Sequence, residues 1–182
     1  MAETTFDFED GNGPVPAHKH SSGGWVADTA WVSDNALVFG DALVYGNAWV
    51  DSYAQVYGNA RVYGDARVFG NALVFGNAQV FGDARVSDNA WVSGNAWMFD
   101  DARVFGNAQA TKALVFISGL GYLVTISDRH MQIGCELHEA DMWSNFTDRE
   151  IAAMDGKRAL QFWRQNRDIL LALCTNHMKS EE

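Results

Sequence analysis

Residues Val56–Leu73 read VYGNAR VYGDAR VFGNAL, which is one six-residue unit, Val-x-Gly-Asn-Ala-x, repeated three times without an insertion. The unit occurs fourteen times in succession between Val26 and Gln109, opened by valine or once by Met98, and its fifth place is always alanine. A period of six fits neither an α-helix of about 3.6 residues per turn nor a long alternating strand. Each unit must therefore be a short strand followed by a corner, and stacked units predict a β-solenoid.

The third and fourth places of the unit carry the residue types that a corner needs. The third place is glycine in nine units, and the fourth is asparagine or aspartate in twelve. These residues tolerate the positive φ angles of a tight turn. One unit departs from the pattern at Asp51-Ser52-Tyr53 and puts a tyrosine at a corner, either as tolerated decoration or as a binding handle.

The repeat resembles that of hexapeptide-repeat proteins, in which an aliphatic residue is followed four places on by a small one. The resemblance implies a left-handed parallel β-helix with three units in each triangular coil, hence about five coils of eighteen residues here. Three tripeptides, Asp65–Arg67, Asp83–Arg85 and Asp101–Arg103, recur at that spacing and would stack about 4.8 Å apart. An aspartate column beside an arginine column offsets like-charge repulsion, so the tripeptides predict a solvated charge ladder. An anion or partner site built on the arginines is the alternative.

Three segments follow from the changes in composition. Residues 1–19 are acidic and then broken by glycine and proline, so we expect a mobile or loosely docked arm. Residues 20–113 form the hexapeptide-repeat β-helix. Residues 114–182 predict a small α+β unit with strands at 114–117, 122–126 and 131–133, then two helices. The first helix opens at a capping box, Thr147-Asp148-Arg149-Glu150, and Gly156 separates it from the second. We expect this unit to cap the coils or support oligomerisation.

Composition limits the classes of function and the compartment. The net charge of −10 argues against nucleic-acid binding, which needs clustered lysine and arginine. It suits a basic partner or simple solubility. The two cysteines, Cys135 and Cys174, are too few for a disulfide framework and fit a reducing compartment. The first residues do not resemble a signal peptide, and no apolar run reaches membrane-spanning length, so a cytoplasmic protein is expected.

The residues beside each inward valine point outward and are unusually aromatic. Such columns would expose apolar patches larger than a monomer usually tolerates, so at least one face should be covered. Copies of the same chain, as a dimer or trimer, are the first expected cover; the C-terminal helices or a different protein are the others. The predicted partner-binding residues are Arg67, Arg85, Arg103, Phe69, Phe105, Tyr45, Tyr63, Phe81, Phe99, Trp31 and Trp49.

The resemblance also implies an activity, because many hexapeptide-repeat proteins are acyltransferases that use acetyl-CoA and a histidine base. All five histidines of this chain lie outside Val26–Gln109, and the inserted loops that shape an acceptor pocket are missing. The candidate bases are therefore His130 and His138. With Cys135 they are also the candidate metal ligands, although their spacing does not match that of a structural zinc site. A non-enzymatic protein of this fold would need no cofactor, whereas an acyltransferase would need acetyl-CoA.

These observations favour a non-enzymatic β-solenoid that binds protein partners through flat aromatic and arginine-bearing faces. The whole chain resembles bacterial and prophage-encoded repeat proteins described as transferases by fold, and fold alone does not confer function. If the chain is phage-encoded, inhibition of a basic host protein is one expected use. The alternative is an acyl-CoA-dependent transferase with a site between subunits.

Overall fold

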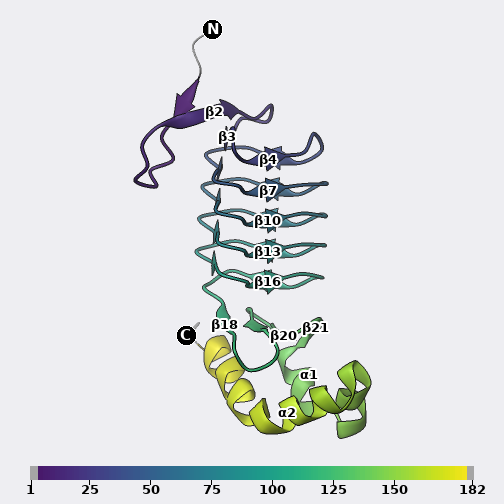
Figure 1. Ribbon diagram of the computed structural model, residues 1–182. Helices are drawn as coiled ribbons and strands as arrows, with labels where there is room; N and C mark the ends of the chain where they lie inside the picture. Colours follow the sequence, from purple (N-terminus) through teal and green to yellow (C-terminus); the bar gives the residue numbers. More distant parts are fainter. Residues whose placement is uncertain (1–3, 180–182) are drawn as a thin grey trace. The chain divides into compact units, whose positions relative to one another are not determined.

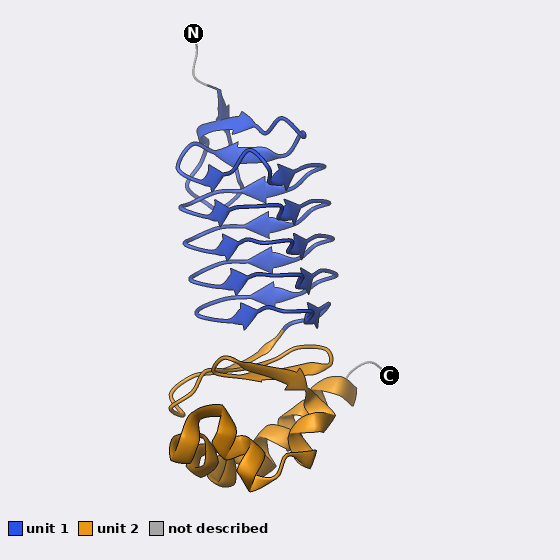
Figure 2. Ribbon diagram, turned by 90° about the vertical axis from the view of Figure 1, so that its right-hand side faces the viewer, with its two compact units in different colours: residues 1–113 blue, residues 114–182 orange. Residues whose placement is uncertain are grey.

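The chain forms two compact units, residues 1–113 and 114–182 (Figure 2). The computed structural model describes residues 4–179. Neither helix of this described part has the length and apolarity needed to cross a membrane.

The first unit is a parallel β-solenoid of about five coils (Figure 1). Each coil contributes one short strand to each of three sheets, and Val44 pairs in parallel with Val62, eighteen residues on. The predicted three units per coil are thereby confirmed. The strands are β3 (Trp25–Ala27), β4 (Trp31–Val32), β5 (Leu37–Val38), β6 (Leu43–Val44), β7 (Trp49–Val50), β8 (Gln55–Val56), β9 (Arg61–Val62), β10 (Arg67–Val68), β11 (Leu73–Val74), β12 (Gln79–Val80), β13 (Arg85–Val86), β14 (Trp91–Val92), β15 (Trp97–Met98), β16 (Arg103–Val104) and β17 (Gln109–Ala110).

The invariant positions of the repeat build the interior of the solenoid. From Ala36 to Ala96 the repeat valines, the repeat alanines and Met98 beyond them are fully buried. The valine side chains fill the solenoid interior beneath each strand. The smaller alanine side chains leave room where the chain turns toward the next sheet. Backbone hydrogen bonds join successive coils, as from Leu43 N to Ala60 O at 3.0 Å. The strands are thus buried on the inner side by side chains and paired along the solenoid axis by their backbones.

The corners combine positive φ angles with ladders of asparagine side chains. Gly46 has φ of 68°, and a Cβ built there would lie only 2.9 Å from the backbone nitrogen of Gly64. Non-glycine residues take the same conformation at Ser52, Asp88 and Asp100, with φ of 60°, 59° and 50°. Side-chain amides then bond along the axis: Asn59 donates to Asn77 at 3.1 Å, and Asn77 donates to Asn95 at 3.2 Å.

The segment before the coils differs from the loose arm expected of residues 1–19. Strands β1 (Thr5–Phe6) and β2 (Val15–Lys19) form an antiparallel extension of the sheet that contains β3. The physical reason lies in two aromatic side chains within the acidic run. Phe8 is 1% exposed, and the Phe6 ring stacks on Trp25 with centroids 4.4 Å apart. The part of the expected arm at residues 1–3 lies outside the described residues.

The second unit is an antiparallel sheet followed by helices. The strands are β18 (Val115–Ile117), β19 (Val124–Ile126), β20 (His130–Ile133) and β21 (Glu136–Glu139), in that order across the sheet, and the last of them was not predicted. The helices are α1 (Ala140–Asn145), also not predicted, and α2 (Asp148–Lys179). The predicted capping box is confirmed, since Thr147 N donates to the Glu150 carboxylate at 2.8 Å. The predicted break is also present, because Asp155 and Gly156 leave helical geometry inside α2.

Candidate functional site

The sheet of β4, β7, β10, β13 and β16 carries a row of large outward side chains. In β7, β10, β13 and β16 the residue before the buried valine points to solvent, and in β4 the exposed Trp31 precedes the part-buried Val32. Parallel pairing aligns Arg67 with Arg85 and Arg85 with Arg103. We call this the Trp/Arg face, made by Trp31, Trp49, Arg67, Arg85 and Arg103 with the flanking Phe69 and Phe105. The two tryptophans are 46% and 45% exposed, which is high for this residue type. The predicted stacking of the arginine tripeptides is thus confirmed.

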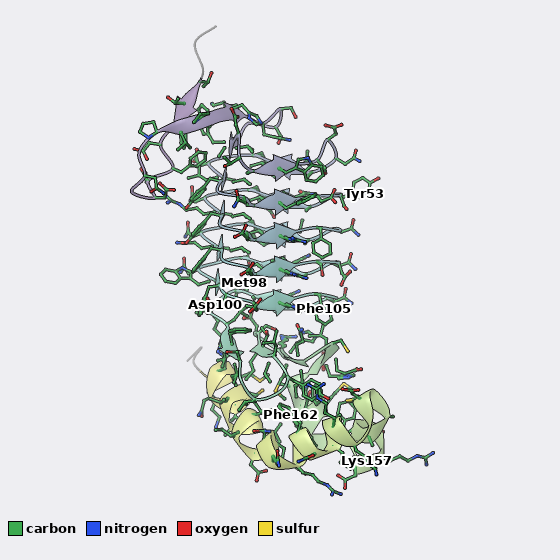
Figure 3. The ribbon with its side chains drawn as sticks, in the orientation of Figure 1. Tyr53, Met98, Asp100, Phe105, Lys157 and Phe162 are labelled. Carbon is green, nitrogen blue, oxygen red and sulfur yellow. The ribbon has the colours of Figure 1, made fainter. Side chains whose placement is uncertain are left out.

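The side chains of this face contact one another and leave a shallow recess. The Trp31 and Trp49 rings meet edge to face with centroids 4.7 Å apart. The Arg67 guanidinium carbon lies 5.9 Å from the Trp49 ring centroid, within cation–π range. Trp49, Asp51, Arg67 and Phe69 line a recess of about 210 Å³. Phe105, labelled in Figure 3, directly follows β16 in the last coil.

The expected charge ladder is stacked but not joined by ion pairs. Within residues 4–179, no ion pair links Arg67, Arg85 or Arg103 to the aspartates of the three tripeptides. Asp65 instead accepts a hydrogen bond from the Asn47 amide at 3.2 Å. The arginine row is therefore presented to solvent as positive charge, and the aspartate row two residues earlier as negative charge.

The second aromatic column, Tyr45, Tyr63, Phe81 and Phe99, is covered in large part by itself. Its first three rings are nearly parallel with centroids 4.9 Å apart, and the last pair is 5.8 Å apart. The Phe8 ring covers the end of the column, which leaves Tyr45 6% exposed. Burial raises the pKa of the Tyr45 phenol, and also that of Tyr63. Because the coil spacing equals a stacking distance, these rings offer edges rather than faces to a partner.

The third column repeats this arrangement at another corner. Tyr57 stacks between Phe39 and Phe75 with centroids 4.8 Å and 4.9 Å away. These two columns are therefore self-stacked, whereas the Trp/Arg face combines exposed tryptophans with a row of arginines. Trp91 and Trp97, on the other two sheets, are also 45% and 51% exposed.

The candidate histidines do not converge on one site. His130 pairs across the sheet with Glu139 and Met131 with His138, so the two histidines lie on opposite faces of the sheet. The His138 ring packs edge-on against Trp143 and Phe146, with centroids 5.2 Å and 4.8 Å away. Burial lowers the pKa of His130.

Cys135, the remaining candidate ligand, is exposed in the turn between β20 and β21. In the part of the chain that the structure describes, no three His, Cys, Asp or Glu side chains gather as a metal-binding group. The candidate metal ligands His130, Cys135 and His138 are therefore not assembled into a three-ligand site.

A cavity in the second unit was not predicted from the sequence. It has a volume of about 280 Å³ and lies among the sheet, α1 and both limbs of α2. Buried aromatic rings form its base, and Tyr122, Glu136 and Asp155 stand at its polar side. The available signals were Gly156 and the aromatic residues that follow it, but neither shows that the limbs of a broken helix would leave a space between them.

The fold and the repeat together show that the chain is a β-solenoid repeat protein. The family model described as YdcK Beta solenoid repeat matches residues 54–68, 66–82, 78–94 and 84–98, so these coils are similar to that family's repeat. No curated protein and no solved structure matches the chain.

Proposed function

We propose that this protein is a β-solenoid scaffold that binds a protein partner through the Trp/Arg face. The observation that carries the proposal is the contrast between the outward columns. The Tyr45 and Phe39 columns stack on themselves, and the exposed Trp91 and Trp97 of the other two sheets have no row of arginines beside them. Trp31, Trp49 and Phe69 are 39–46% exposed beside three aligned arginines. Tryptophan and arginine are the residue types that contribute most to protein interfaces. A flat sheet presents them without the entropy loss of ordering a loop.

A second copy of the chain is the partner whose charges fit this face best. The arginine row needs acidic side chains at about the spacing of neighbouring strands, roughly 4.8 Å. The row Asp65, Asp83 and Asp101 has that spacing in every copy, because the same coil rise sets both rows. Side-by-side solenoids in a dimer or trimer could therefore place one copy's arginines against the next copy's aspartates. Such alignment favours association and fixes its register.

Light scattering over a range of concentrations tests this proposal directly. We expect the native protein to associate, and Arg85→Glu to weaken association at least tenfold while leaving the circular dichroism unchanged. Arg149→Glu is the matched control, since it makes the same charge change at an exposed position in α2. A native protein that stays monomeric at every concentration, or an Arg85→Glu variant that associates as well as the control, would overturn self-association.

Two more specific functions, inhibition of a host protein and acyl transfer, can be tested by further measurements. Inhibition of a basic host protein, expected of a phage-encoded chain, would use the acidic surface, so its binding would survive Arg85→Glu and weaken with salt. An acyl-CoA-dependent transferase would be stabilised against heat by acetyl-CoA, and His130→Gln would remove its activity. Burial lowers the pKa of His130, so its imidazole is neutral at pH 7 and able to accept a proton, as the base of such a transferase must be.

A further inference from the structure

The break in α2 creates the cavity of the second unit. Gly156 has φ of 63° and ψ of −148°, a conformation that side chains other than glycine's avoid. The helix therefore changes direction, and the limb at residues 148–154 and the limb at 157–179 both line the cavity. Protein interiors hold few voids larger than a water molecule, which occupies about 30 Å³. A volume of about 280 Å³ is much larger than such a packing gap.

The base of the cavity is aromatic and rigid. Trp143, Phe162 and Trp163 are 2–6% exposed, and the Trp143 Nε1 donates to Met131 O at 2.7 Å. Phe162, labelled on α2 in Figure 3, also meets the Tyr122 ring edge to face at 5.0 Å. Rings fixed in this way give the cavity an apolar, aromatic lining that suits another ring.

The polar side of the cavity carries two carboxylates. Asp155 is exposed, and the Glu136 side chain is 36% exposed, so both reach solvent while lining the cavity. Glu136 Oε2 also lies 3.4 Å from His138 Nε2. Tyr122 donates its hydroxyl hydrogen to Asp155 Oδ2 at 2.5 Å, which leaves the second carboxylate oxygen available. The pKa of the Tyr122 phenol is raised, first by burial and then by this hydrogen bond, so the phenol remains a donor at neutral pH. The Arg158 guanidinium lies 4.7 Å from the Tyr122 ring centroid and donates to Gly121 O at 2.8 Å, and Arg158 is not among the residues that line the cavity.

We propose that this cavity binds a small aromatic amine, with its ring against Trp143 and Phe162 and its ammonium group at Asp155 and Glu136. Size limits the ligand to one or two fused rings, since the volume of about 280 Å³ is just below the usual range of about 300–1,000 Å³ for small-molecule pockets. The two carboxylates favour a cation over a neutral or anionic molecule of the same shape. This site is independent of the Trp/Arg face.

Calorimetric titration of the full chain with tryptamine, indole and indole-3-acetate tests the proposal. We expect one saturable site for tryptamine, weaker binding of indole, and binding of indole-3-acetate at least tenfold weaker than that of tryptamine. Asp155→Asn should weaken tryptamine binding at least tenfold and leave indole unchanged. Asp168→Asn is the matched control, because Asp168 is a 99% exposed carboxylate on α2 outside the cavity.

A second variant tests the cavity itself. Ala159 lines the cavity, and Ala159→Leu should fill part of it and abolish binding of both tryptamine and indole. If that variant fails to fold, the comparison of Asp155→Asn with Asp168→Asn still decides the outcome. No tryptamine binding to the native protein, equal binding of the three probes, or a folded Ala159→Leu variant that binds both probes as well as the native protein would each overturn the proposal.

Discussion

The Phe8 ring lies 4.9 Å from the Tyr45 ring and nearly parallel to it, at 24°. This contact ties the hairpin of β1 and β2 to the aromatic column of the first unit. Removing the ring by Phe8→Ala should detach the hairpin and expose Tyr45, because a buried phenylalanine usually contributes about 3–5 kcal/mol. We expect faster hydrogen exchange at the amides of β2 and β3. The raised pKa of Tyr45 should also fall toward its ordinary value, since burial is its first cause.

A matched ring deletion separates this local effect from general destabilisation. Phe75→Ala removes one ring of the Phe39–Tyr57–Phe75 stack, whose rings do not stack on Phe6 or Phe8. It should lower stability without changing the tyrosinate titration of Tyr45 or the exchange of β2. Equal exchange at β2 in both variants would show that Phe8 does not anchor the hairpin.

The repeat made the solenoid predictable, because each property of a coil is decided within six residues and their copies eighteen residues away. The inward valine and alanine positions, the glycine corners and the alignment of Arg67 with Arg85 all follow from that period. The same period also explains the self-covering of the Tyr45 column, although its rings were predicted to be exposed. The coil spacing is also a stacking distance, so neighbouring rings cover one another.

The hairpin and the cavity were not predictable in this way, because they depend on contacts between segments without a period. Phe8 lies in an acidic run, and its partner Tyr45 is far along the chain. The cavity needs a sheet, a helix and two limbs of α2 together, and only the break at Gly156 was visible in the sequence.

The glycine corners predict a graded cost for added methyl groups. Gly46→Ala should be strongly destabilising, because a Cβ there would lie 2.9 Å from Gly64 N and the positive φ adds about 1–2 kcal/mol of strain. Gly13→Ala is the control: its φ is 74°, but nothing lies within 4 Å of the added Cβ. Urea unfolding midpoints should therefore fall much further for Gly46→Ala. Similar midpoints would mean that backbone conformation, rather than the approach of the next coil, requires the glycine.

Tyr53 interrupts an asparagine ladder, so its replacement should stabilise the solenoid. Tyr53 is 65% exposed at an outer corner of the solenoid (Figure 3). One coil further on, at the same corner, Asn71 donates to Asn89 at 3.1 Å. Tyr53→Asn would extend that ladder by one amide, and a hydrogen bond of this kind contributes about 0.5–1.5 kcal/mol. We expect a higher unfolding midpoint. Tyr57→Asn is the contrast, since it removes a ring stacked on both sides and should lower the midpoint.

Two histidines predict a loss of stability in mild acid. Burial lowers the pKa of His130, and burial followed by the nearby His18 lowers that of His20. A histidine with a lowered pKa in the folded state binds fewer protons than in the unfolded chain, where its pKa is about 6.5. Its contribution to stability is therefore complete above that value and is lost as the pH falls toward the folded pKa.

Unfolding free energy measured between about pH 7 and pH 5 should decrease in the native protein, and less steeply in His130→Gln and His20→Gln. The double variant should have the shallowest slope, because the two residues are far apart in sequence and belong to different units, so their effects should add. The pKa values of Asp10 and Glu150 are also lowered, each first by a backbone hydrogen bond. These carboxylates titrate at lower pH, so they should not change the slope of stability between about pH 7 and pH 5. A double variant with the native slope would assign the acid sensitivity to other groups.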